Sequence, residues 1–151
     1  MSNQEYLFWC ARSESDYAAD KIAANGLTQA EAEEISKSSF TTLLPDGLPS
    51  KDNFLFSVWK DSERIVGYLW FAIRGVQDNR KAFIYDLVIE KEFRGQGFGR
   101  QTMILLEAEV RLRGLKHIGL HVFGFNDRAI GLYKSLGYGV TDLVMEKALS
   151  D

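Results

Sequence analysis

The sequence has very little of what an exported or metal-binding protein usually carries. It contains a single cysteine, Cys10, so no disulfide can form within the chain, and with two histidines it has no Cys/His cluster at metal-ligand spacing. Its apolar runs, such as YLFWCA, are far too short to span a bilayer, and no basic segment followed by an apolar one indicates export. We therefore expect a cytoplasmic protein that binds neither a membrane nor a metal.

Neither sign of charge is in large excess. The 151 residues carry 18 basic and 21 acidic side chains, for a net charge of −3, and 46% of them are hydrophobic. A chain of this length and composition can bury a core, so we expect one domain over residues 1–151. A slightly acidic protein without a basic, aromatic-rich face is a poor candidate for nucleic-acid binding.

The charge is unevenly distributed along the chain. Residues 1–63 hold 11 acidic and 5 basic side chains, a net of −6, whereas residues 64–151 hold 10 acidic and 13 basic ones, a net of +3. This asymmetry suggests two ligands of opposite sign, and ordinary solvated surface charge is an equally good explanation. The acidic side chains of the first expected helices are Glu14, Asp16, Asp20, Glu31, Glu33 and Glu34.

Proline is rare, and both prolines fall in one segment, Leu44–Asp52, which we predict to be a loop. Before this loop, Tyr6–Arg12 is predicted to form a short strand. Ser15 can cap a helix that ends near Asn25, and the capping box TQAE opens a second helix over residues 28–40.

After the loop, strand and helix patterns alternate. The predicted strands are Phe54–Trp59, Ile65–Ile73, Ala82–Ile89, His117–Phe123, Tyr138–Val140 and Leu143–Lys147. The stripe of Met103, Leu106 and Val110 predicts a long helix ended by Gly114, and Asn126 can cap a short helix closed by Gly137. This order predicts an α/β protein of the α+β type, with about four helices and a mixed, mostly antiparallel sheet of about six to seven strands around one parallel crossover.

The segment EFRGQGFGRQ, residues 92–101, is the most distinctive part of the chain. It follows a predicted strand and opens the long helix, whose first amide groups are unpaired and carry a partial positive charge. Glycines let an anion approach such amides, and arginines add charge that matches phosphate oxygens. The segment fits neither the Walker pattern nor the G-x-G-x-x-G fingerprint. It predicts a phosphate or pyrophosphate cradle, with a flexible turn as the alternative.

A second motif, NDRAIGLYKSLGY over Asn126–Tyr138, follows the next strand. Together with the R-x-x-G-x-G spacing of Arg94–Gly99, it resembles the GCN5-related N-acetyltransferase (GNAT) family. The resemblance covers about residues 53–147, which would form the core that binds acetyl-coenzyme A. The two helices before it, about residues 14–45, would occupy the variable region that binds the acceptor. A GNAT fold has a central parallel strand pair that splays to admit the acetyl-coenzyme A.

The resemblance implies where acetyl-coenzyme A binds as cosubstrate. Its pantetheine arm would lie along Leu87, Val88 and Ile89, and a backbone N–H of Val88 or Ile89 would polarise the thioester carbonyl. Asn126 matches a residue that contacts this arm, and it can also cap its helix. The pyrophosphate would rest on the backbone of Arg94, Gly95, Gln96, Gly97, Phe98, Gly99 and Arg100.

Three side chains are candidates for the catalytic proton transfers. Tyr133 matches the family tyrosine that protonates the departing thiolate and also contacts the cosubstrate. An amine is protonated at pH 7, so a base must accept its proton. Asp86 is a carboxyl in an otherwise apolar strand, and some polyamine-acetylating members carry an acid there. His121 is the alternative base, at a position where some N-terminal acetyltransferases have a glutamate. Core packing of Tyr133 and a structural role for His121 are the competing interpretations.

The resemblance implies direct transfer from acetyl-coenzyme A to an amine in a ternary complex, so we interpret Cys10 as structural rather than as an acyl carrier. The acidic first region favours a primary amine acceptor, either a small polyamine-like molecule or a peptide amine. The alternative is a domain that binds acyl-coenzyme A as a sensor without transferring anything. A homodimer is possible, because Trp59 or Trp70 could serve an interface, with packing in the core as the alternative.

Overall fold

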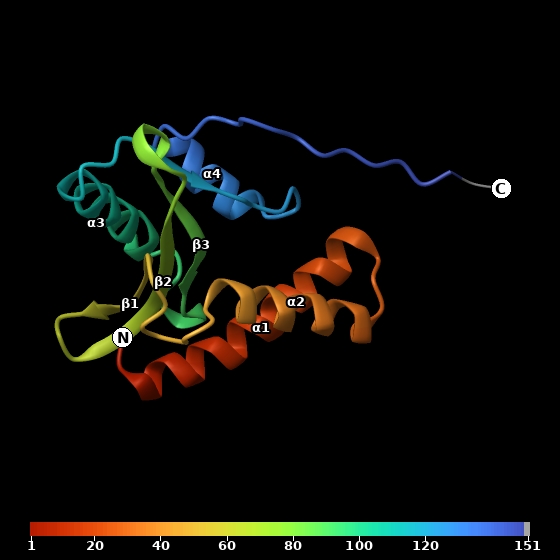
Figure 1. Ribbon diagram of the computed structural model, residues 1–151, viewed down its shortest axis with the longest axis horizontal. Coiled ribbons are helices and arrows are strands. Elements are labelled where there is room, and N and C mark those ends of the chain that lie inside the picture. The colour runs from red at the N-terminus through yellow and green to blue at the C-terminus, as the bar shows by residue number, and fades with distance from the viewer. Residues whose placement is uncertain (150–151) are drawn as a thin grey trace.

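The structure is a computed structural model that describes residues 1–149. A four-stranded sheet lies at its centre, with helices on both faces (Figure 1). The strands follow each other across the sheet in chain order: β1 (Asn53–Lys60), β2 (Arg64–Arg74), β3 (Lys81–Ile89) and β4 (Ile118–Leu120). The first three pair antiparallel, and β4 pairs parallel with β3. The α+β class with a mixed sheet is therefore confirmed.

Helices α1 (Asn3–Asn25) and α2 (Gln29–Leu43) cover one face of the sheet, and α3 (Phe98–Leu112) and α4 (Asp127–Ser135) lie on the other (Figure 1). A short 3-10 turn at Gln77–Asn79 lies between β2 and β3, and a second at Lys91–Phe93 lies between β3 and α3. The four predicted helices are present, and α3 supplies the crossover between the parallel strands.

The predicted strand Tyr6–Arg12 is wrong, because these residues form the first half of α1. Ser2 and Glu5 make a capping box at its start, so Ser15 lies inside the helix and caps nothing. Nothing in the sequence breaks the helix before Gly26, which ends it with a φ of 64°. The aromatic run resembles a strand, but its buried side chain, Trp9, has helical spacing with the buried Ser13.

The sheet has fewer strands than predicted. Of His117–Phe123, only Ile118–Leu120 pairs with β3. The predicted closing strands Tyr138–Val140 and Leu143–Lys147 are not formed among the described residues, where residues 139–149, here called the tail, are exposed and extended (Figure 1). A strand needs a neighbouring edge, and the tail runs beside none. The expected six to seven strands are therefore four.

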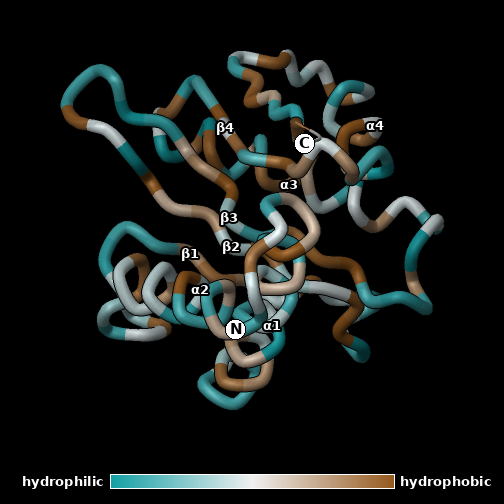
Figure 2. Tube along the Cα trace, turned by 90° about the vertical axis from the view of Figure 1, so that its right-hand side faces the viewer, coloured by the Kyte–Doolittle hydropathy of each residue, from teal (hydrophilic) through white to brown (hydrophobic). Residues whose placement is uncertain are grey.

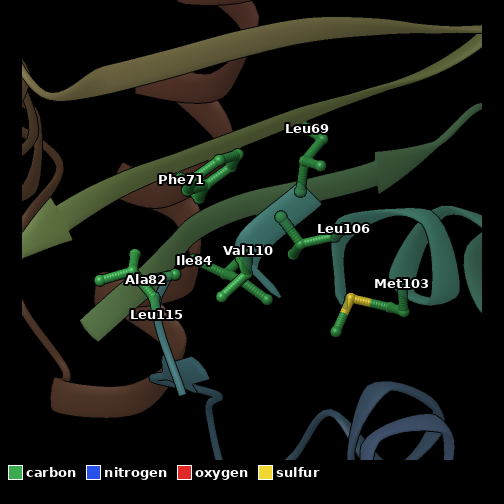
Figure 3. Packing of buried hydrophobic residues seen from close by; sticks show 8 residues of the cluster. All are labelled: Leu69, Phe71, Ala82, Ile84, Met103, Leu106, Val110 and Leu115. Atoms are coloured by element: carbon green, nitrogen blue, oxygen red, sulfur yellow. The ribbon is translucent and has the colours of Figure 1, made fainter. Parts of the chain in front are cut away.

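The core consists of two clusters, one on each face of the sheet. On the α3 side, Leu69 and Phe71 of β2 pack with Ala82 and Ile84 of β3 (Figure 3). Helix α3 contributes Met103, Leu106 and Val110 to the same cluster, as the helical stripe predicts. The α1 side is aromatic: Trp9, Phe40, Leu44, Leu55, Tyr68 and Trp70. Apolar stretches accordingly run along the strands (Figure 2). No helix within residues 1–149 combines the length and hydropathy needed to cross a membrane.

Candidate active site

A cavity of about 1010 Å³ opens where β3 and β4 diverge. The parallel pairing ends at Ile84 and Leu120, whereas β3 continues to Ile89. The edge of residues 85–89 that faces β4 therefore has no strand partner among the described residues, and these residues line the cavity. The structure thus has the splayed parallel pair that the family resemblance implies.

A bulge in β3 marks the start of this open part. Trp70 pairs with Asp86 and Phe71 pairs with Ile84, so Tyr85 is an extra residue without a partner on β2. The ring of Tyr85 stacks on Trp70, with centroids 4.5 Å apart. The bulge bends β3 at the residue before Asp86, which lines the cavity.

The glycine-rich loop closes one end of the cavity. Gly97 precedes α3 with a φ of 88°, a conformation that a residue with a side chain rarely adopts, and no side chain caps the first amides of the helix. A Cβ on Gly99 would lie 3.4 Å from Cδ2 of Leu132, so the loop also passes close to α4. The result is an uncapped helix N-terminus with bare backbone, as an anion site requires.

The side chains of the loop are less directly involved than its backbone. Arg94 donates from Nε to the carbonyl of Ile89 at 2.8 Å, and Arg100 donates from Nη2 to Oγ of Ser135 at 2.6 Å. Both residues line the cavity. Gln96, which the sequence suggests as a binding residue, does not line it, because its amide turns back to the carbonyl of Glu92 at 2.9 Å.

Arg128 is a cavity residue that the sequence analysis missed. It lies in the first turn of α4, and its Nη2 lies 3.9 Å from the position that a Cβ on Gly95 would occupy. A third arginine therefore faces the loop, beside Arg94 and Arg100. In the sequence, its position two residues after Asn126, within the Asn126–Tyr138 motif, was the only indication that it belongs to the site.

Asn126 and Tyr133 both line the cavity from the α4 side. The side-chain oxygen of Asn126 accepts from the amide of Ala129 at 3.2 Å, so the predicted helix cap is present. Burial, together with the nearby carboxyl of Asp86, raises the pKa of Tyr133 to about 12. The phenol therefore stays protonated at neutral pH and is available as a donor.

Asp86 lies at the boundary of cavity and aromatic cluster, and two donors from α1 hold it. Nε1 of Trp9 and Oγ of Ser13 donate to the same oxygen, Oδ2, at 2.8 and 2.7 Å. Burial raises the pKa of the Asp86 carboxyl, and these two hydrogen bonds and the positive charge of Arg12 oppose that rise. Trp9 and Ser13 were missed as site residues because the sequence analysis placed the first segment in a strand.

His121 and Cys10 differ in their relation to the cavity. His121 follows β4 and lines the cavity, with its ring perpendicular to that of Phe123 at 5.1 Å. Cys10 does not line it, and its thiol contacts the carboxyl of Glu14 at 3.7 Å. Burial raises the pKa of Cys10, which makes this thiol a poorer nucleophile.

The α1 end of the cavity carries charges of both signs. Of the six acidic residues noted in the sequence, Asp16 and Asp20 line it, and burial and the charge of Asp16 raise the pKa of Asp20. Arg74 also lines this end, and its guanidinium lies 4.2 Å from the Phe83 ring centroid. Three others bond elsewhere: Glu14 to Cys10, Glu31 to Thr28 and Glu33 to Gln29. Within residues 1–149, His, Cys, Asp and Glu side chains form no cluster that could hold a metal ion.

The sheet, its splayed strands and the glycine-rich helix entry together define a GNAT-type acyltransferase fold. The family model of the acetyltransferase (GNAT) family matches residues 22–138. The chain therefore belongs to the acetyltransferase (GNAT) family, and it is an acyltransferase.

Among its relatives is the uncharacterized N-acetyltransferase YycN of Bacillus subtilis, 34% identical over 99% of this chain and 96% of that protein. The crystal structure of YycN aligns with a TM-score of 0.95, over 100% of this chain and 96% of the other. YdgE of the same organism is 28% identical, over 99% and 95% of the two chains. A more distant fold relative is AAC(6')-Iy, crystallised with a coenzyme A bisubstrate analogue: 15% identity, TM-score 0.61, over 100% and 95% of the two chains.

Proposed function

We propose that this acyltransferase moves an acetyl group from acetyl-coenzyme A to a primary amine, by direct transfer while both substrates are bound. The observation that carries the proposal is a single cavity in which the unpaired part of β3 and the uncapped N-terminus of α3 meet. An extended thioester arm can pair with the open part of β3 as an added strand does, and a diphosphate can bind the N-terminus of α3.

The residues around the loop suit the diphosphate in charge as well as in shape. The first amides of α3 are open, Gly99 leaves room beside Leu132, and Arg94, Arg100 and Arg128 add positive charge. Leu87, Val88 and Ile89 are proposed to lie along the pantetheine arm, but Val88 directs its backbone groups toward β2, because Glu90, two residues on, donates its N–H to the Val66 carbonyl of β2. The N–H of Ile89 faces away from β2 and is therefore the proposed donor to the thioester oxygen. Asn126 is proposed to contact the same arm.

The proposed chemistry requires two proton transfers. The ammonium group of the acceptor gives one proton to Asp86, to His121 or to a water molecule beside them, and the free amine then attacks the carbonyl carbon. A C–N bond forms and the C–S bond breaks, and the departing sulfur takes the phenolic proton of Tyr133. The raised pKa of Tyr133 keeps that proton in place until the thiolate develops.

The acceptor is proposed to enter from the α1 side, where Asp16 and Asp20 attract a cationic amine. AAC(6')-Iy, a distant fold relative, was crystallised with a bisubstrate analogue that joins coenzyme A to an acetylneamine. The acetylneamine part of that analogue is an amine, which supports an amine acceptor for this fold. Either a small polyamine-like molecule or a peptide amine is compatible with the charge of this end.

The test compares thiol release with cosubstrate binding. Tyr133→Phe is expected to lower kcat about 10²–10⁴-fold, and Asp86→Asn to lower it by a similar factor if Asp86 is the base. Both variants should keep the affinity of the parent for coenzyme A, measured by calorimetry. His121→Gln distinguishes the two candidate bases. If kcat falls in His121→Gln while Asp86→Asn remains active, His121 is the base.

A non-catalytic sensor would give a different pattern. The parent would bind acetyl-coenzyme A but release no free thiol with any member of a broad panel of cationic amines. A parent that shows no binding heat with coenzyme A would contradict both the transferase and the sensor.

A further inference from the structure

Arg74 lines the cavity at the end opposite the glycine loop. It is the last residue of β2 and pairs with Lys81, the first residue of β3, whereas the loop follows the end of β3. The nine residues of β3 extend over about 27 Å. Arg74 is therefore too far from the loop to share the diphosphate that is proposed to bind there, and its positive charge needs a separate explanation.

The guanidinium of Arg74 is held by aromatic rings. It lies 4.2 Å from the ring centroid of Phe83 and 4.3 Å from that of Tyr85. Tyr85 in turn stacks on the buried Trp70, so these rings are anchored in the core. Contacts of this kind orient a guanidinium, and they leave N–H donors available for an anion.

No acidic side chain in the described part of the chain forms an ion pair with Arg74. The ion pairs within residues 1–149 lie elsewhere, at Arg12, Arg111 and Arg113. Lys81 is directly opposite Arg74 in the β2–β3 ladder, so a second positive charge lies on the same face of the sheet. Like charges in such a pair destabilise a sheet, and an anion bound beside them would offset that cost.

We propose that Arg74 binds a carboxylate of the acceptor, so that the acceptor carries both a primary amine and a carboxylate, as an amino acid or a short peptide does. This inference rests on the acetyl transfer proposed above and adds the substrate class. The guanidinium fork fits the two oxygens of a carboxylate, and the aromatic rings fix it before the acceptor binds. Asp16 and Asp20, at the same end of the cavity, suit the ammonium group. A polyamine is disfavoured, because its second ammonium group would meet a like charge.

The structure also indicates the distance between the two groups of the acceptor. The guanidinium lies over Phe83 and Tyr85, and Asp86, one of the two candidate bases, directly follows Tyr85 in β3. The midpoint of Phe83 and Tyr85 is two residues before Asp86, which corresponds to about 7 Å along a strand. An extended dipeptide, or an ω-amino acid of similar length, bridges such a distance.

The first experiment compares three acceptors of matched chain length, with the full chain and acetyl-coenzyme A. 5-Aminopentanoate ends in a carboxylate, pentylamine in a methyl group and 1,5-diaminopentane in a second ammonium group. Because a charge-assisted hydrogen bond is gained, thiol release should show a kcat/KM about 10- to 100-fold higher for 5-aminopentanoate than for pentylamine. The diamine should be the poorest of the three. Equal or faster turnover of pentylamine or of the diamine would overturn the proposal.

Substitution of Arg74 should remove this preference. Arg74→Gln is expected to raise KM for 5-aminopentanoate about 10- to 100-fold and to change the turnover of pentylamine little. Arg74→Lys should restore part of the preference, because it keeps the charge and loses the fork. Arg80→Gln is the matched control, since Arg80 is an exposed arginine just before β3 that does not line the cavity. An equal loss with both acceptors in Arg74→Gln would make Arg74 a structural residue and overturn the proposal.

A second pair of acceptors distinguishes the two sources of the carboxylate. The amidated tripeptides Gly-Asp-Ala and Gly-Asn-Ala differ in one carboxylate and share the same N-terminal amine. A preference for the first that disappears in Arg74→Gln identifies a peptide acceptor. An Arg74-dependent preference for 5-aminopentanoate alone identifies a free amino acid. No Arg74-dependent preference in either set of acceptors overturns the proposal.

Binding measured without turnover separates this inference from the proposed transfer. 5-Aminopentanoate is titrated by calorimetry into the protein saturated with coenzyme A, and its affinity should fall at least about tenfold in Arg74→Gln. The affinity for coenzyme A itself should not change. Arg74-dependent binding without any thiol release would contradict the transfer and retain the carboxylate site. Thiol release from amines without Arg74-dependent binding would retain the transfer and overturn the carboxylate site.

Discussion

The two faces of the sheet are covered by core clusters of different side-chain type. The cluster on the α3 side is mainly aliphatic. The cluster on the α1 side is dominated by Trp9, Phe40, Tyr68 and Trp70, and it encloses the carboxyl of Asp86. One face therefore stabilises the fold in the ordinary way, whereas the other combines packing with the support of an ionisable group.

This difference predicts that substitutions on the two faces have different effects on the free energy of unfolding and on the pKa of Asp86. Removing atoms on the α3 side should change the free energy of unfolding and little else. Removing atoms on the α1 side should change the free energy of unfolding and also the pKa of Asp86, because the donors to Oδ2 belong to that face.

The largest effect is expected from Trp9→Ala, with Met103→Ala as its counterpart on the other face. Both side chains are fully buried, so we expect losses of about 4 and about 3 kcal/mol in the free energy of unfolding, measured with urea. Only Trp9→Ala should shift the acidic limb of the pH profile of kcat/KM. If Trp9→Ala does not fold, Trp9→Phe keeps most of the packing and removes the indole donor. Equal pH profiles for Trp9→Phe and Met103→Ala would contradict the comparison.

The next largest effect concerns the glycine loop. Gly97→Ala places a Cβ in the left-handed region, at a φ of 88°, which costs about 1–2 kcal/mol. If the loop must keep this conformation to bind coenzyme A, the affinity measured by calorimetry should fall about tenfold. Gly131→Ala in α4 is the control, because its Cβ meets nothing within 4 Å, and binding should not change. Unchanged binding by Gly97→Ala would place the cosubstrate elsewhere.

A smaller, stabilising effect is expected from Asp86→Asn. Burial raises the folded-state pKa of Asp86 above the unfolded value of about 3.9, so the folded state holds its proton to higher pH. The stability of the parent should therefore fall as pH rises from about 4 through the folded pKa. Asp86→Asn keeps an oxygen acceptor and lacks this loss, so it should gain roughly 1 kcal/mol at pH 7. Urea titrations at several pH values test this, and parallel curves for both proteins would contradict it.

The smallest effect is expected from Ser13→Ala. Losing one donor to the charged form of Asp86 should raise its pKa, so the acidic limb of kcat/KM should move to higher pH by up to about one unit. Ser36→Ala is the matched control, since its buried hydroxyl donates at 2.7 Å to the carbonyl of Glu14 instead. A limb that does not move for Ser13→Ala would favour His121 as the base.

The α3 side was largely predictable from the sequence, and the α1 side was not. The stripe of Met103, Leu106 and Val110, the Asn126 cap and the glycine loop are local patterns whose meaning does not depend on distant residues. The strand prediction for Tyr6–Arg12 was wrong because aromatic residues occur in both strands and helices. Only the capping box at Ser2 indicated a helix.

Other features could not be predicted because they arise from contacts between distant segments. Arg128 faces Gly95 only after α4 has packed beside the loop. Trp9 and Ser13 reach Asp86 across more than seventy residues of chain. The tail was predicted as two strands from its composition, but a strand forms only beside the edge of another strand, and within the described residues the tail pairs with none.

The continuous course of α1 links two requirements that an enzyme would otherwise adjust separately. The same helix carries Trp9 and Ser13, which donate hydrogen bonds to the Asp86 carboxyl, and, about one and two turns after Ser13, Asp16 and Asp20, which line the cavity at the proposed acceptor side. A shift or tilt of α1 that makes room for a larger acceptor would therefore also change the pKa of Asp86. Evolved variants with a different acceptor preference would then also differ in the pH dependence of their activity.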